Sequence, residues 1–148
     1  MKIYARLLEP GRLDVNGRIA NYDEVTSIDH QGKLRNEPCR NNPDFKAFMQ
    51  AMVTDMFTNY ELDGYQWGSE RSGPLAEVLS RANTPGCFCE HCRQRAKNSG
   101  IDPQRAIEGY TLLLDTIKKS FAGNPPAHDS VMNRVLHLFI HYPEILAW

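Results

Sequence analysis

The sequence lacks the features that would place the chain in or across a membrane. Apolar residues make up 41% of its 148 positions, but they occur in runs of only a few residues. A bilayer span needs about 20 consecutive apolar residues. The first twelve residues, MKIYARLLEPGR, contain neither a long apolar segment nor a small-residue cleavage site, so no signal peptide is recognisable. We therefore expect no membrane partner, and the compartment stays open, with the cytoplasm as the default.

A large net charge of either sign is lacking as well. The chain carries 17 Lys+Arg against 18 Asp+Glu, for a formal net charge of −1. Nucleic acids and anionic membranes favour strongly basic surfaces, so this balance argues for neither. Arg93, Arg95 and Lys97 form only a small basic stripe, and we expect no nucleic-acid partner. Internal repeats and low-complexity segments are also missing, which leaves an ordinary globular composition.

Hydrophobic patterning predicts strands that alternate with helices. A β-rich apolar segment ends at the turn signal Glu9-Pro10-Gly11, and Asn42-Pro43-Asp44 has the cap, first-turn proline and acidic residue of a helix start. The long polar stretch between them reads mostly as loop. The predicted strands are residues 2–8 and 64–67, with minor strands at 18–22 and 25–28. The predicted helices begin near residues 42, 90, 102 and 129.

This order is typical of βαβ units and a parallel sheet. Two main strands cannot complete such a sheet, and the apolar residues 145–148 read as the entry into a further strand. We therefore expect residues 1–148 to be a piece of a larger α/β domain.

The four cysteines are the strongest chemical signal. Three lie in the run Cys87-Phe88-Cys89-Glu90-His91-Cys92, and Cys39 is the remaining thiol. Zinc favours four thiolates in a tetrahedron, and close spacing lets one knuckle supply several of them. The run therefore predicts a structural zinc site, with Cys39 as fourth ligand or His91 as its substitute. A redox-sensing or copper-binding thiol cluster is the alternative, whereas a Cys87–Cys89 disulfide would be badly strained.

The other histidines give a weaker signal. His137 and His141 lie four residues apart in the last predicted helix, a spacing that can hold a metal ion. No neighbouring carboxylate or cysteine supports such a site. We therefore interpret these two residues, with His30 and His128, as structural or solvated.

One stretch, residues 60–106, resembles a known family. Asp63-Gly64, the segment Trp67-Gly68-Ser69-Glu70, the cysteine run and Gly100-Ile101-Asp102 are similar to the fourth strand and following loop of glycoside-hydrolase-like (β/α)8 barrels. Among such proteins, the stretch is similar to the family 42 β-galactosidases and to related uncharacterised bacterial barrel proteins. The resemblance implies that the chain is an α/β portion of a TIM barrel with a zinc loop at residues 85–100, in which Cys87, Cys89 and Cys92 bind the ion together with the upstream Cys39.

The resemblance also implies site residues. Glu70 matches the acid/base glutamate, although Ser69 stands where the family has asparagine, and the link to the cysteines is longer. Glu9, at the end of a neighbouring strand, would line the same sugar site. Trp67 would stack on a sugar ring and Arg71 would clamp the substrate. The alternatives are a surface glutamate paired with an arginine, a plain turn at Glu9 and a core tryptophan.

These observations lead to two functional hypotheses. The first is a glycoside-hydrolase-like segment that binds or acts on carbohydrate, with no activity as an isolated chain because the nucleophile would lie on the seventh strand. Such a segment would associate with the remainder of the barrel or with itself. The alternative is a zinc-stabilised protein-interaction module without catalysis.

Overall fold

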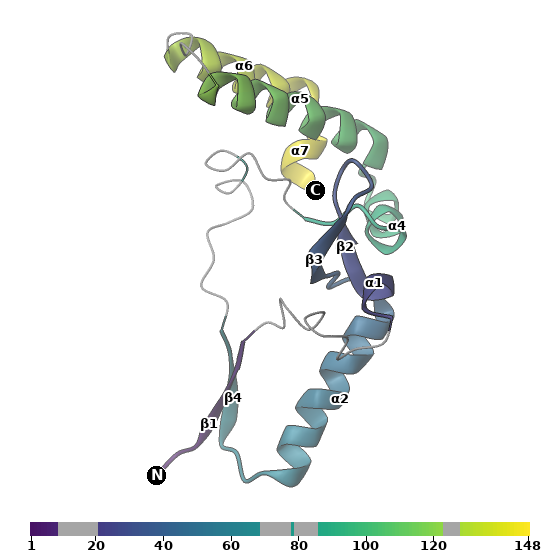
Figure 1. Cartoon of the computed structure of the whole chain (residues 1–148), viewed down its shortest axis with the longest axis vertical. Helices are drawn as coiled ribbons and strands as arrows, with labels where there is room; N and C mark the ends of the chain where they lie inside the picture. The colour runs from purple at the N-terminus through teal and green to yellow at the C-terminus, as the bar shows by residue number, and fades with distance from the viewer. Residues whose placement is uncertain (9–20, 69–77, 79–85, 123–127) are drawn as a thin grey trace. The chain divides into compact units, whose positions relative to one another are not determined.

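The computed structural model describes residues 1–8, 21–68, 78, 86–122 and 128–148. The chain forms two compact units, one of residues 1–27 and 34–71 and the other of residues 28–33 and 72–148. Figure 1 labels their helices and strands. Within the described ranges, no helix is both long enough and apolar enough to cross a membrane.

The first unit contains a parallel pair of strands. β1 (Tyr4–Leu8) pairs with β4 (Gly64–Gly68) in a register that runs from Tyr4 opposite Gly64 to Leu8 opposite Gly68. The pairing extends one residue further, because Ile3 N donates to Asp63 Oδ2 at 2.6 Å and Asp63 N donates to Ile3 O at 2.9 Å. Both main strands predicted from the sequence are confirmed.

The same unit contains the helix α2 (Pro43–Asn59), which begins where the sequence predicts. The Oδ1 atom of Asn42 accepts hydrogen bonds from Asp44 N at 2.8 Å and Phe45 N at 3.1 Å. Two of the otherwise unpaired amides at the helix start are thereby satisfied. Asn42 is itself buried, and its Nδ2 donates to Glu24 O at 3.0 Å. The cap therefore anchors α2 to the segment before it.

The polar stretch after residue 20 is more ordered than the sequence suggests. It contains α1 (Tyr22–Val25), β2 (Thr26–Ile28) and β3 (Leu34–Pro38). Asp29 Oδ1 closes the turn between the two strands by accepting from Gln31 N at 2.8 Å and Lys33 N at 2.9 Å. The strand predicted at 25–28 is confirmed. The strand predicted at 18–22 is wrong in its described part, since Tyr22 begins a helix. The sequence pattern did not predict β3.

Helices make up the bulk of the second unit. They are α4 (Glu90–Asn98), α5 (Pro103–Phe121), α6 (His128–His141) and α7 (Glu144–Ala147). α5 and α6 lie side by side and run in opposite directions (Figure 1). Their apolar faces form the core, which includes Leu113, Leu114, Ile117, Val135 and Ile145.

The expectation that residues 145–148 enter a strand is wrong, because most of them belong to α7. This short helix docks on α5. Tyr110 donates its hydroxyl to Ile145 O at 2.6 Å, and Ile145 is only 2% exposed. Gly109 makes room for it, since a Cβ atom there would lie 2.7 Å from Ile145 Cγ1. Arg105 Nε also donates to Glu144 Oε1 at 2.8 Å.

The predicted fold class, a βαβα portion of a TIM barrel, is also wrong. The described strands form two separate two-stranded sheets, β1–β4 and β2–β3. In a barrel, each helix would bury its apolar face against a continuous sheet. Here α5, α6 and α7 pack against one another, and α2 leaves Phe48 43% and Phe57 44% exposed. The described residues form a mainly helical chain with small sheets.

Candidate metal centre

The cysteine run forms a short knuckle that leads into α4. Cys87 and Cys89 precede the helix, with Cys89 at its N-cap position, and Cys92 lies in its first turn. Gly86 opens the knuckle with a φ of +72°, a conformation that glycine adopts without strain. The Cys89 side chain makes no capping hydrogen bond to α4. The knuckle thus presents three sulfur atoms within six residues.

Cys39, one residue beyond β3, completes the cluster. The Sγ atoms of Cys39, Cys87, Cys89 and Cys92 all lie within 4.8 Å of one another. None of the four forms a disulfide, and Cys87 alone among them is more than marginally accessible. Around a tetrahedral Zn²⁺ with Zn–S near 2.3 Å, the sulfur atoms would lie about 3.8 Å apart. The cluster therefore needs to contract by at most about 1 Å to enclose an ion.

The prediction that Cys39 joins the other three cysteines is confirmed, and the cluster can hold a metal ion. His91, the predicted substitute, is exposed and does not belong to this group of ligands.

The surroundings of Cys87 favour its thiolate form. Its Sγ accepts hydrogen bonds from Ile28 N at 3.3 Å and Cys89 N at 3.4 Å. Phe88 N donates to Ile28 O at 2.7 Å, so the tip of the β2–β3 hairpin and the knuckle are held together by backbone atoms. Amide donors stabilise a charged sulfur more than a neutral one. The positive end of α4 acts in the same direction on Cys89 and Cys92.

An aromatic layer backs the knuckle. Phe88, between two of the cysteines, is 1% exposed. Its ring stacks on Trp148, with centroids 4.3 Å apart and planes at 6°, and meets the Tyr110 ring edge-on at 5.9 Å. Trp148 also covers Gly86, where a Cβ atom would lie 3.4 Å from the indole Cδ1. This packing fixes the position of the knuckle. The sequence reasoning missed it, although a large aromatic residue enclosed by ligands was a signal for it.

The residues predicted to bind carbohydrate are not brought together by the described structure. Glu9, Glu70 and Arg71 lie outside the described residues. The backbone of Trp67 belongs to β4, opposite Leu7 of β1. The predicted sugar site therefore stays a prediction. In the predicted zinc loop, 85–100, the described part begins at Gly86 and contains the knuckle and α4.

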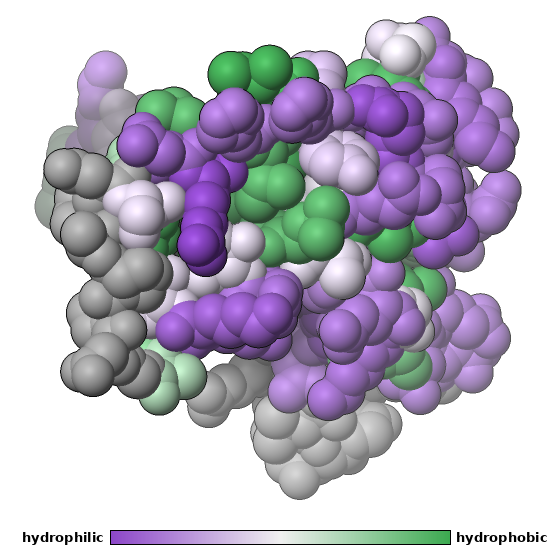
Figure 2. Space-filling view, turned by 90° about the horizontal axis from the view of Figure 1, so that it is seen from above, coloured by the Kyte–Doolittle hydropathy of each residue, from purple (hydrophilic) through white to green (hydrophobic). Residues whose placement is uncertain are grey.

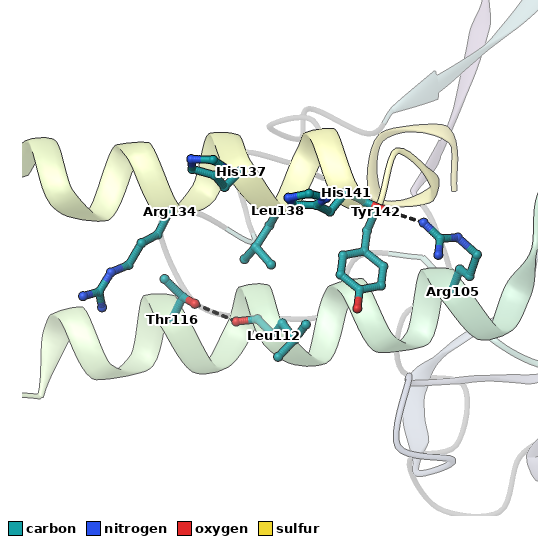
Figure 3. Close-up of a pocket in the computed structure, with 8 residues that line it drawn as sticks. All are labelled: Arg105, Leu112, Thr116, Arg134, His137, Leu138, His141 and Tyr142. Atoms are coloured by element: carbon teal, nitrogen blue, oxygen red, sulfur yellow. Dashed lines mark hydrogen bonds between the residues drawn. The ribbon is translucent and has the colours of Figure 1, made fainter.

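A second polar site, not predicted as a whole, lies on the helices α5 and α6. Figure 3 shows a shallow groove between them, lined by Arg105, Arg134, His137 and His141 among others. The guanidinium of Arg105 lowers the pKa of Glu144, mainly through their hydrogen bond, and the carboxylate in turn raises the pKa of Arg105. Only the two histidines were noticed in the sequence, from their spacing.

No family model, curated protein or solved structure matches this chain. The function must therefore be argued from the chemistry of these two sites.

Proposed function

We propose that this chain is a zinc-stabilised protein-interaction module in which Cys39, Cys87, Cys89 and Cys92 hold a structural Zn²⁺ ion. The observation that carries the proposal is the gathering, within 4.8 Å, of four sulfur atoms that form no disulfide. Four thiolates in a tetrahedral arrangement are the ligand set of structural zinc. Such a set fills the coordination sphere and leaves no open position for water or substrate, which argues for a structural role.

The placement of the ligands supports a stabilising role. Cys39 follows β3, whereas the other three belong to the knuckle before α4 and to its first turn. Cys87 lies 48 positions after Cys39, so an ion bound by both would restrict the unfolded state strongly. Metal binding and folding are coupled when the site does not exist in the unfolded chain. Removal of the ion should therefore lower the free energy of unfolding.

Exposed apolar side chains support the interaction role. Met132, Leu136 and Ile140 are 47%, 50% and 73% exposed, and their spacing of four residues places them along one side of α6. Seen from the side of α5 and α6, Figure 2 shows hydrophobic residues at the surface among hydrophilic ones. Contiguous exposed apolar side chains are typical of binding surfaces. The carbohydrate role implied by the resemblance stays a prediction, since it depends on Glu9 and Glu70.

Metal analysis of the purified chain tests the zinc centre. We expect one zinc per chain in the wild type, and Cys39→Ser should lose the ion to a chelator that the wild type resists. His91→Gln is the matched control, because His91 is exposed and adjacent to Cys92 without being in the cluster. Unchanged zinc retention in Cys39→Ser would show that the four-cysteine site is wrong. Copper in place of zinc would overturn the choice of metal.

A photo-crosslinking amino acid placed at position 140 tests the interaction role. In cells, we expect discrete adducts from position 140 and none from position 108, an exposed site on α5. Equal crosslinking from both positions, or none from position 140, would contradict the assignment of this face of α6.

A further inference from the structure

His137 and His141 form a pair of parallel imidazoles on α6. Their ring centroids lie 6.0 Å apart, and the ring planes differ by 14°. Both side chains are exposed, and among the described residues neither imidazole makes a hydrogen bond. Figure 3 shows both rings projecting from the same side of α6, with their nitrogen atoms turned the same way. Each ring can thus offer one nitrogen lone pair to a ligand from solvent.

The separation of the rings is close to that of a metal chelate. Two imidazoles bound to one ion, with metal–nitrogen bonds of about 2.0–2.1 Å, have their centroids roughly 4.5–5.5 Å apart. The observed 6.0 Å exceeds this range by about 1 Å or less. Rotation about the side-chain bonds of these two exposed residues can close the difference and turn the near-parallel rings until their nitrogen lone pairs meet at one ion, without moving α6. Histidines at i and i+4 on one helix face are a known zinc-binding arrangement.

The positive charges of the groove do not block this site. The carboxylate of Glu144 compensates Arg105, which also donates to His141 O and lies over the Tyr142 ring at 5.2 Å. Arg134 extends toward α5, and both imidazoles also line the groove between α5 and α6 (Figure 3). Arg134 has no carboxylate partner among the described residues, and its guanidinium is turned toward α5 rather than between the two rings. It is placed instead to favour an anionic group near a bound ion.

We propose that His137 and His141 form a second metal site, independent of the cysteine centre. It would take a divalent ion that favours imidazole, of the class of Ni²⁺, Cu²⁺ and Zn²⁺. Two protein ligands leave the remaining coordination positions open to water or to an anionic ligand. The two sites differ in chemistry, since the cysteine centre offers four thiolates and the pair on α6 offers only nitrogen. Ion binding would also fasten the last turn of α6, which leads into α7.

Isothermal titration of the zinc-loaded chain with Ni²⁺, without any histidine tag and near pH 7.5, tests the proposal. We expect one Ni²⁺ to bind with no release of zinc. His137→Gln and His141→Gln should each weaken this binding by roughly 10- to 100-fold or more, since even indirect partners of metal ligands contribute that much. His91→Gln, at another exposed histidine, should bind Ni²⁺ as the wild type does.

Three results would overturn the proposal. One is the absence of Ni²⁺ binding to the wild type. Another is binding that persists unchanged in the His137→Gln and His141→Gln variants. The third is zinc release equal to the Ni²⁺ bound, which would place the Ni²⁺ at the cysteines. Circular dichroism of each variant, with α6 intact in all of them, separates loss of the ligands from loss of the helix.

Discussion

Replacement of Phe88 tests whether the aromatic layer holds the cysteine knuckle in place. Phe88 is 1% exposed and makes two ring contacts, a stacked one with Trp148 and an edge-on one with Tyr110. Phe88→Ala would cost about 3–5 kcal/mol, close to the whole stability of a small domain. Phe88→Leu is the sharper change, because it keeps an apolar side chain and removes both ring contacts. At about 0.5–1.5 kcal/mol for each contact, we expect a loss of about 1–3 kcal/mol.

Urea unfolding of the zinc-saturated proteins, followed by circular dichroism, measures this loss. Phe121→Leu is the matched control, since Phe121 is 67% exposed at the end of α5 and should change stability by less than about 0.5 kcal/mol. The zinc content of Phe88→Leu should equal that of the wild type, because Phe88 supplies no ligand. If Phe88→Leu were no more destabilising than the control, the aromatic layer would not support the knuckle.

Two further predictions concern the docking of α7 on α5. Gly109→Ala should destabilise the chain by about 1–3 kcal/mol, because the new Cβ would lie 2.7 Å from Ile145 Cγ1 and 2.8 Å from Tyr142 Cβ. In an exposed helix, the same substitution would stabilise by about 0.5–1 kcal/mol. Thermal unfolding measures this, and a stabilised variant would contradict the docking. Tyr110→Phe removes the hydroxyl that donates to Ile145 O and should cost about 1–2 kcal/mol near pH 8. Burial raises the pKa of Tyr110 to about 12, so the contribution of this residue to the free energy of unfolding is full below pH 10 and is lost as the pH rises toward 12. Urea unfolding near pH 8 and near pH 11 should therefore show a larger fall in the free energy of unfolding for the wild type than for Tyr110→Phe.

Local sequence signals predicted most individual elements correctly. Asn42-Pro43 begins α2, Asp102-Pro103 begins α5, and the glycine after α4, Gly100, adopts the left-handed conformation with a φ of +75°. These features are decided by caps and by hydrophobic period within a few residues, so the sequence carries them directly.

The errors came from features that depend on distant partners. β3 is a polar strand, LRNEP, with no hydrophobic alternation, and its pairing with β2 depends on the Asp29 turn. α7 is an apolar segment of a length that suits either a strand or a helix. It becomes a helix because Gly109 and Tyr110 of α5 receive it. The barrel interpretation failed in the same way, because the order of elements does not show which of them pack together.

All four members of the cysteine cluster were predicted: the three knuckle thiols from their spacing, and Cys39 as the one remaining thiol and from the resemblance. The histidine pair was noticed and set aside, because no neighbouring carboxylate or cysteine supported it; the exposure of both rings and their parallel arrangement are seen only in the structure. The sequence also could not show that the backbone amides of Ile28 and Cys89 donate hydrogen bonds to the Cys87 sulfur, since these bonds depend on where the β2–β3 hairpin lies.

The pairing of β1 with β4 has a consequence for the order in which the chain assembles. Ile3 and Asp63 meet across sixty residues of sequence. Closing a loop of that length costs roughly 3–4 kcal/mol of chain entropy before any pairing contact repays it. α5 and α6 follow one another directly and can associate much sooner. The two strands should therefore join late during folding, and their amides should be among the first to exchange with solvent when the native protein opens locally.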